Sequence, residues 1–444
     1  MDAVILARLQ FAITIGFHFL FPPLTIGLAW LLVIAEWLGW KRGDADYRRI
    51  GKFFGKILGL TFAVGVASGI VMEFQFGTNW GEYSKFVGDI FGAPLAAEGI
   101  FAFFLESGFL GLYLFGRNRV SPGVHWFSAL MVALGSTLSA FWIIAANSWQ
   151  QTPAGYVIRN GRAELTSFFD AIFNPSTVIR YLHTVDAALI AGAFLMAGIA
   201  AYYLLAGRET EFARKAMTLS VIFGLVVSVL EAMPFGHAHA QQVARTQPEK
   251  FAAIEGLYTS QDGAPLVLFA YPVNHPPALK APVEIPGLLS WLAFGDVSAP
   301  IKGINEFPPD EIPPLWLTFV SFHNMVLLGG YFIAVMGFAA FRLRRGTLWS
   351  GRRFLKLLVW STPLPLIACQ LGWIAAEVGR QPWAVYRLLR TADAVSFTVG
   401  AGEILFSIIL FTLIYGCLGG LYLFLLLRKV KHGPETFEGK EAAA

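Results

Sequence analysis

The sequence predicts an all-α integral membrane protein with nine transmembrane helices. Of its 444 residues, 56% are hydrophobic and 14% are charged, whereas about a quarter of the residues in a soluble domain are charged. A helix needs about 20 mainly apolar residues to cross the ~30 Å apolar core of a bilayer. Such stretches occur near residues 7–39, 57–76, 94–115, 125–147, 178–206, 216–236, 315–341, 355–378 and 398–427.

The ends of these stretches predict the orientation of the chain. The first stretch, MDAVILARLQFAITIGFHF, has no basic start and no small-residue cleavage site, so it is expected to stay as a span and not to be a signal peptide. Every second connection is basic, and cytoplasmic connections are the ones enriched in Lys and Arg. The N-terminus is therefore expected outside and the C-terminus in the cytoplasm. The basic residues concerned are Lys41, Arg42, Arg48, Arg49, Lys52, Lys56, Arg117, Arg119, Arg208, Arg214, Lys215, Arg342, Arg344, Arg345, Arg352, Arg353, Lys356, Arg428, Lys429 and Lys431.

Charge and cysteine content exclude two further classes. The net charge of +4 does not indicate a nucleic-acid partner, because the basic residues fall in short clusters between apolar spans and not on one face. The two cysteines, Cys369 and Cys417, both lie in apolar spans. They predict neither a disulfide framework nor a thiolate metal site.

The chain divides into three parts. Residues 1–236 carry spans one to six, residues 237–314 form a long outer loop, and residues 315–444 carry spans seven to nine and a cytoplasmic tail. The loop segments PVNHPPALKAPVEIP and EFPPDEIPP predict stiff, non-helical chain. A connection of this length is usually functional, although an insertion without function is the alternative.

One segment of the loop, ARTQPEKFAAIEGLY, predicts a short amphipathic helix. Lys250 and Glu255 would lie opposite Phe251, Ile254 and Leu257. Such a helix is either a plain surface helix or a site at the membrane edge for an amphiphilic reductant. In the second case the two charged side chains would contact its polar head and take its protons.

Six side chains that are unusual in a membrane are expected at various depths in the outer half of the bundle. Any one of them alone is more often hydrogen-bonded to a neighbouring helix, or simply packed, than a ligand. Together they indicate haem, because His and Met are axial haem ligands and bundles project such ligands inward. No CxxCH motif is present, so such a haem would be held non-covalently. The six are His18, Glu98, Glu106, His183, Met325 and Glu377.

Two spacings that involve these residues are informative. Glu98 and Glu106 are eight residues apart, which predicts the same side of a helix at ~12 Å separation. They could relay protons, or one could contact a metal; the alternative is that Ser, Trp or Asn side chains on adjacent helices satisfy both. His323 and Met325 are roughly 200° apart around a helix, so they cannot both face one site.

Several motifs, in this order along nearly the whole chain, resemble those of subunit I of the cytochrome bd family of quinol oxidases, of the short quinol-loop type. The resemblance implies a terminal oxidase that oxidises membrane quinol, reduces dioxygen to water and separates charge across the membrane. The motifs are RLQFAITIGFHFLFPPLTIG (8–27), MEFQFGTNW (72–80), VGDIFGAPLAAEGIFAFFLES (87–107), YLHTVDA (181–187), QPEKFAAIEG (247–256) and GRQPW (379–383).

The resemblance also implies roles for single residues. His183 and Met325 would bind a low-spin haem b, and His18, Glu98 and Glu377 would serve a high-spin haem b and a haem d or a further haem b. Glu106 would belong to the proton path and act with Glu98 in catalysis. Trp373 and Arg380 would lie near the haems, and Lys250 and Glu255 would contact the quinol. One departure is the sequence FHNM, where the family usually has Arg two positions before Met and this chain has His323.

The implied partners are a membrane quinol, dioxygen, the lipid bilayer, a second oxidase subunit and small accessory membrane subunits, with no nucleic acid. The implied location is the cytoplasmic (inner) membrane of a bacterium or archaeon. Two rival functions are a transporter or channel, which predicts repeated halves and a colourless protein, and a haem-bearing anchor that only relays electrons, which predicts pairs of histidine ligands.

Overall fold

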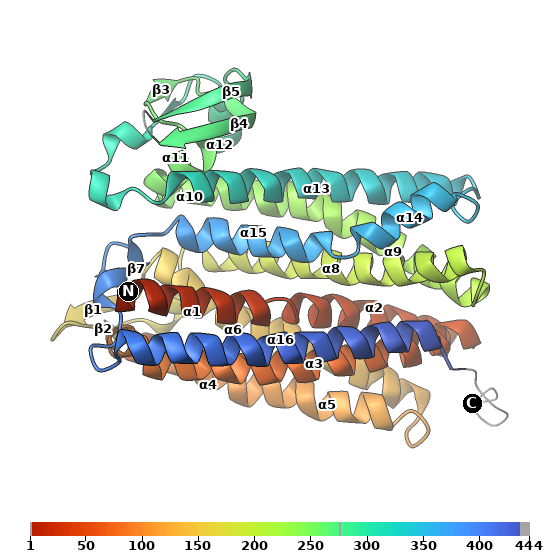
Figure 1. Cartoon of the computed structure of the whole chain (residues 1–444). Coiled ribbons are helices and arrows are strands. Elements are labelled where there is room, and N and C mark those ends of the chain that lie inside the picture. The colour runs from red at the N-terminus through yellow and green to blue at the C-terminus, as the bar shows by residue number, and fades with distance from the viewer. Residues whose placement is uncertain (1, 275–276, 436–444) are drawn as a thin grey trace.

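The computed structural model describes residues 2–274 and 277–435. Within these residues, nine helical spans are long and apolar enough to cross a membrane, which confirms the predicted number. The spans run side by side, with the N-terminus at one end of the bundle and the C-terminus at the other (Figure 1). The fold is mostly and not entirely helical, because the described chain also contains four small two-stranded sheets.

The spans extend beyond their apolar cores, so most are longer than predicted. The third begins at Gly81, not near residue 94, because the polar segment before its apolar core is also helical. The helices of the spans are α1 (Ala3–His18), α2 (Pro22–Lys41), α3 (Ala45–Thr78), α4 (Gly81–Ala97), α5 (Phe104–Phe115), α6 (Pro122–Gln151), α8 (Thr177–Ala206), α9 (Thr210–Leu230), α10 (His237–Thr246), α13 (Leu315–Arg344), α14 (Arg352–Ser361), α15 (Leu364–Val378) and α16 (Ala401–His432).

Three of the spans are interrupted beside residues of interest. The first span stops at His18 and restarts as α2 at Pro22, whose ring nitrogen has no hydrogen to donate to the preceding turn. A π-helical turn, η1 (Glu98–Phe103), joins α4 to α5. A second turn, η2 (Glu231–Gly236), joins α9 to α10 and contains one residue, Met233, with non-helical φ and ψ angles.

Helix α8 is the centre of the bundle. In its most apolar window 78% of the residues are buried, against 17% in α16. Gly27 of α2 lies so close to α8 that an added Cβ atom would be 2.2 Å from the Ala188 carbonyl oxygen, and small residues permit such close helix packing in membranes. Large apolar side chains such as Phe74 and Phe406 are exposed on the outside of the bundle, as expected for surfaces in contact with lipid.

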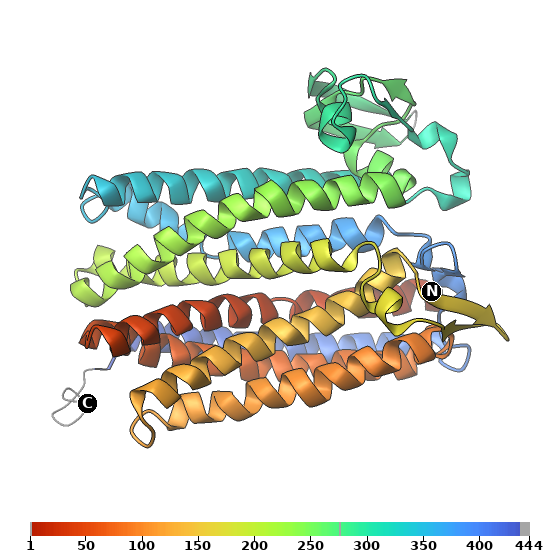
Figure 2. The same ribbon diagram turned by 180° about the vertical axis from the view of Figure 1, so that it is seen from behind.

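The segment 237–314 forms a folded module at the same end of the bundle as the N-terminus (Figures 1 and 2). The predicted boundary at 237 falls in helix, because the sixth span continues to Thr246. The segment PVNHPPALKAPVEIP is non-helical, but most of it pairs into a hairpin, with residues 275–276 outside the described part. The module contains α11 (Pro248–Glu255), β3 (Gln261–Asp262), β4 (Leu266–Asn274), β5 (Pro277–Ile285), α12 (Leu288–Phe294), β6 (Pro300–Ile301) and the 3₁₀ turns Ile304–Glu306 and Pro309–Glu311.

Two other connections at this end are also ordered. Their elements are β1 (Tyr156–Arg159), β2 (Arg162–Leu165) and α7 (Phe168–Ile172) between the fourth and fifth spans, and β7 (Trp383–Val385), β8 (Leu389–Arg390) and a 3₁₀ turn (Thr391–Asp393) between the eighth and ninth. Strand β7 begins with the last residue of the GRQPW motif, so this motif lies where α15 leaves the bundle.

Candidate functional site

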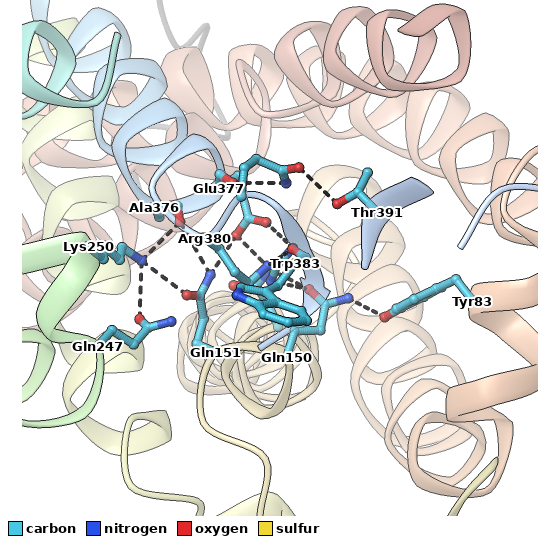
Figure 3. Close-up of polar contacts among 12 residues, drawn as sticks. Tyr83, Gln150, Gln151, Gln247, Lys250, Ala376, Glu377, Arg380, Trp383 and Thr391 are labelled. Carbon is cyan, nitrogen blue, oxygen red and sulfur yellow. Dashed lines mark hydrogen bonds and ion pairs between the residues drawn. The ribbon is translucent and has the colours of Figure 1, made fainter. Parts of the chain in front are cut away.

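Glu377, on the last turn of α15, is the centre of a buried polar network (Figure 3). Its Oε1 accepts hydrogen bonds from Asn147 Nδ2 at 3.1 Å and Gln151 Nε2 at 3.3 Å, and its Oε2 accepts one from Arg380 Nη2 at 2.5 Å. Arg380 also donates from Nη1 to Gln150 Oε1 at 2.8 Å. Helix α6 and the GRQPW motif are therefore joined around one carboxylate.

Lys250 enters the same network from the outer module. Its Nζ donates to the Ala376 carbonyl oxygen at 2.9 Å and to Gln151 Oε1 at 3.0 Å (Figure 3). Burial, followed by the positive charge of Arg180, lowers the pKa of Lys250 well below its usual range. Helix α11 is buried on all sides, so the expected amphipathic surface helix is not what the structure has. Its residues pack against both the module and the bundle.

Glu255 lies on the same helix but does not pair with Lys250 in the described part of the chain. It is 4% exposed, and its Oε2 has no hydrogen-bond partner there. Burial raises the pKa of Glu255 to about 8. Helix α11 ends directly afterwards at Gly256, whose φ of +68° favours glycine and whose added Cβ atom would lie 2.9 Å from the Phe319 ring.

His183, near the start of α8, faces the turn η2. Its Nδ1 is 3.0 Å from Glu231 Oε1, and its ring is 5.1 Å from that of His239 between centroids. Asp186 lies one turn further along α8 and is buried. Glu231, Asp186 and His239 are not among the site residues predicted from the sequence, although an ionisable residue inside an apolar span, such as Glu231 in VVSVLEAMPFG, is itself a signal of function.

Helix α15 contacts both Met325 and the region of His18. A Cβ atom on Gly372 would lie 2.8 Å from Met325 Sδ, so only glycine leaves room for this thioether. The next residue, Trp373, packs against Phe19 with ring centroids 5.8 Å apart. The Nδ1 atom of His18 itself lies 3.0 Å from Ser68 Oγ. Helix α15 therefore meets Met325 at Gly372 and meets the neighbour of His18, Phe19, at Trp373.

Glu98 is the first residue of the π-helical turn and Glu106 lies beyond the turn, so the simple helical spacing assumed from sequence does not apply. The third span begins at Gly81 and ends at Phe115, which places Glu106 in the half away from the outer module and not in the predicted outer half. Glu98 Oε1 accepts a hydrogen bond from Ser139 Oγ at 2.7 Å. Glu106 is buried beside Gly135 of α6, and the two carboxylates are close enough to interact electrostatically. Glu73, in the motif MEFQFGTNW, also interacts with Glu98 and was overlooked in the sequence.

His323 contacts the outer module and its own helix. Its Nε2 lies 3.0 Å from the Val267 carbonyl oxygen of β4 and its Nδ1 lies 3.1 Å from the Phe319 carbonyl oxygen. Its ring stacks on that of Phe319 with centroids 3.9 Å apart. His323 therefore joins α13 to the outer module.

The candidate haem ligands lie singly on separate helices and do not form a cluster around one metal ion in the described residues. In the described ranges, no three His, Cys, Asp or Glu side chains gather as ligands for one metal ion. Single nitrogen or sulfur donors on separate helices are what an axial haem ligand set requires.

Comparison with known proteins decides the family. The family described as cytochrome bd terminal oxidase subunit I matches residues 6–434. The chain belongs to this family. It is a subunit of a cytochrome bd terminal oxidase.

Relatives of the family agree over almost the full length. The chain is 40% identical to the cytochrome bd ubiquinol oxidase subunit 1 of Bacillus subtilis, over 98% of this chain and 95% of that protein. It is 35% identical to the cytochrome bd-II ubiquinol oxidase subunit 1 of Escherichia coli, over 99% of this chain and 98% of that protein. The solved structure of the bd oxidase from Geobacillus thermodenitrificans superposes with a TM-score of 0.92 at 31% identity, covering 98% of this chain and 99% of that one.

The chemistry of these residues fits the haems that the family implies, with the exception of Glu377. His18 and His183 each have a polar neighbour at Nδ1, so that Nε2 is the ring nitrogen that could face a haem, and Gly372 makes room for the Met325 sulfur. Both oxygens of Glu377 are occupied by protein donors. As arranged, Glu377 is the ion-pair partner of Arg380, and it would have to exchange a donor to bind iron.

Proposed function

We propose that this chain holds the haems of a terminal oxidase that oxidises membrane quinol and reduces dioxygen to water, with charge separated across the membrane. The observation that carries the proposal is that single donors on separate helices lie in the half of the bundle that bears the outer module, together with one carboxylate, Glu377; the donors are His18, His183 and Met325. The family membership supports it. The N-terminus and the module would face outward and the C-terminus the cytoplasm, in the cytoplasmic (inner) membrane of a bacterium or archaeon.

His183 and Met325 would hold a low-spin haem b, and His18, Glu98 and Glu377 would serve a high-spin haem b and a haem d or a further haem b. When bound, the haems supply one-electron transfer and a place for dioxygen. Trp373 would fill the space between them, and Arg380 would hold Glu377. A second oxidase subunit and small accessory subunits would complete the assembly.

The protein's own contribution to quinol oxidation would be proton transfer in the module. Glu255 is a buried carboxylate with a free oxygen, so it is suited to accept a proton from a quinol hydroxyl group. Lys250 would hold α11 against the network of Glu377. Glu98 and Glu106 would carry protons from the cytoplasmic side.

A difference spectrum tests the function directly. The reduced-minus-oxidised spectrum should show more than one haem, and carbon monoxide should alter part of it, because only an iron with an open position responds to the gas. A colourless protein would favour a transporter. A haem spectrum without any response to carbon monoxide would favour an electron-transfer anchor.

Glu106→Gln is expected to slow oxygen reduction without loss of haem. The amide keeps the shape of the side chain but removes the group that carries the proton, and general acid–base groups typically contribute 10²- to 10⁴-fold to rate, so a loss of about 10²-fold is expected. Oxygen consumption and haem content would be measured on the same preparation. Loss of a haem from this variant would instead make Glu106 a ligand.

Glu255→Gln is expected to suppress quinol-driven oxygen consumption and to spare consumption driven by a small artificial reductant. Because burial raises the pKa of Glu255 to about 8, this carboxyl is protonated and inactive as a base at lower pH. The quinol-driven rate should therefore rise as the pH increases through about 8 in the wild type, and this rise should be absent from the variant.

The matched control is Glu284→Gln, because Glu284 is an exposed glutamate of the same module. It should leave both rates and the pH profile unchanged. Equal loss with both reductants in Glu255→Gln, at unchanged haem content, would exclude a dedicated quinol site at this residue.

A further inference from the structure

The imidazole of His183 has one carboxylate as a neighbour of its Nδ1 atom. Glu231 Oε1 lies 3.0 Å from Nδ1, a distance suitable for an ion pair, although the two groups are not aligned for a hydrogen bond. Both Nδ1 and Glu231 Oε2 are buried without a hydrogen-bond partner in the described part of the chain. Buried polar atoms are nearly always paired, and a small rotation of the ring would pair Nδ1 with Glu231 Oε1.

The interruption of the sixth span brings this carboxylate to the ring. Glu231 is the first residue of η2, and Met233, two residues later, has φ −144° and ψ 108°, so the chain leaves the helical path there. At the end of the turn, an added Cβ atom on Gly236 would lie 3.7 Å from His183 Cε1. The turn therefore encloses one edge of the imidazole, with Glu231 on that side.

Other charged groups surround the pair, but within the described residues none of them is hydrogen-bonded or ion-paired to Nδ1. Asp186, on the same helix as His183, is buried with Oδ2 unpaired. Arg180 is bonded to Asn147. His239 meets the His183 ring edge to face and not through its nitrogens. The His183 side chain remains 20% exposed, which leaves room for a group at the far nitrogen, Nε2.

We propose that Glu231 is a positioning residue for His183, which keeps the proton on Nδ1, directs Nε2 at the low-spin haem iron and lowers the midpoint potential of that haem. The inference rests on the proposed role of His183 as a ligand. A carboxylate behind a ligating histidine fixes its tautomer and makes the ring a stronger donor. A stronger donor stabilises ferric over ferrous iron, and hydrogen bonding around a ligand is one of the means by which a protein tunes haem potential.

Redox titration of the low-spin haem in three variants tests the inference. Glu231→Gln keeps an acceptor oxygen but removes the charge, so the haem should be retained and its midpoint potential should shift to a more positive value. Glu231→Leu removes the acceptor as well and should give a larger positive shift. Asp186→Asn is the matched control, since it removes a neighbouring buried carboxylate that does not meet Nδ1, and its shift should be smaller than that of Glu231→Gln.

Several results would overturn the inference. One is an unchanged potential in Glu231→Gln and Glu231→Leu with the haem present. Another is an equal shift in Asp186→Asn, which would mean that any nearby charge has this effect. If Glu231→Gln does not assemble, Glu231→Asp keeps the carboxylate. If Glu231→Asp retains the haem with a potential close to that of the wild type, the inference is supported. If Glu231→Asp also loses the haem, Glu231 is a packing residue.

His183→Ala separates this inference from the proposed function. If that variant keeps the low-spin spectrum, His183 is not the ligand, and the ligand assignment fails whatever Glu231 does. If it loses the low-spin spectrum while the potential in Glu231→Gln is unchanged, the ligand assignment stands and only the role of Glu231 is wrong.

Discussion

Replacing His183 by alanine or Met325 by leucine is expected to remove the low-spin haem spectrum and to leave the response to carbon monoxide largely intact. Each residue is proposed to supply one of the two axial bonds to that iron, and the other haems are proposed to use different residues. Gly372 leaves room for the Met325 sulfur, and leucine has a similar volume without a donor atom. Optical difference spectra with and without carbon monoxide measure both effects.

Two neighbouring histidines provide the controls. His323→Ala should keep the low-spin spectrum, because both ring nitrogens of His323 already lie near backbone carbonyl oxygens. His239→Ala should also keep it, since His239 meets His183 only through a ring contact. An unchanged spectrum in Met325→Leu together with its loss in either control would show that the assignment of the second ligand is wrong.

Glu377→Ala is expected to destabilise the protein more than any other change in the outer half of the bundle. Glu377, whose side chain is 18% exposed, pairs with the buried Arg380 and is the nearby negative charge for the buried Arg180. Removing one partner of a buried ion pair typically costs about 3–5 kcal/mol, because the other charge remains buried without compensation. A lower midpoint of thermal unfolding in detergent, with a reduced yield of haem-containing protein, is the expected observation.

Glu82→Ala is the comparison for this prediction. Glu82 pairs with Lys85 at 2.7 Å, but the Lys85 side chain is 62% exposed, and surface pairs contribute about 0–1 kcal/mol. The unfolding temperature of Glu377→Gln should lie between those of Glu377→Ala and Glu82→Ala, since the amide oxygen can still accept hydrogen bonds from Asn147 and Gln151. If Glu377→Ala unfolds at the same temperature as Glu82→Ala, the network around Glu377 contributes little to stability.

The sequence was sufficient to predict the nine spans, because the cost of placing polar chain in lipid makes each span visible as an apolar stretch. It did not predict where the helices end. The segment from Gly81 and the continuation to Thr246 are helical outside the apolar core, where hydropathy carries no information. The hairpin of β4 and β5 was also missed, because proline-rich chain indicates only that a helix is absent.

The candidate site was predicted in part, through the cost of ionisable groups in a membrane. That cost singled out His18, His183 and Glu377, but the sequence could not say what surrounds them. The partners of Glu377 come from α6, about 230 positions away along the chain. Likewise, the periodicity of QPEKFAAIEG gave the helix α11 but not the burial of Lys250, because packing of the module on the bundle buries every face of that helix.

The π-helical turn at Glu98–Phe103 makes the length of the third span as important as its composition. Such a turn corresponds to one residue more than a regular α-helix would use. The extra residue is taken up within the turn, so the residues beyond it keep the faces they would have on a regular helix one residue shorter. A single-residue deletion of an apolar residue inside the turn is therefore expected to convert it into regular α-helix and to leave Glu106 beside Gly135. The same deletion in the regular helix α5 would rotate everything beyond it by about 100° and draw it back by about 1.5 Å. Deletions in the turn are therefore expected to be tolerated better than deletions in α5.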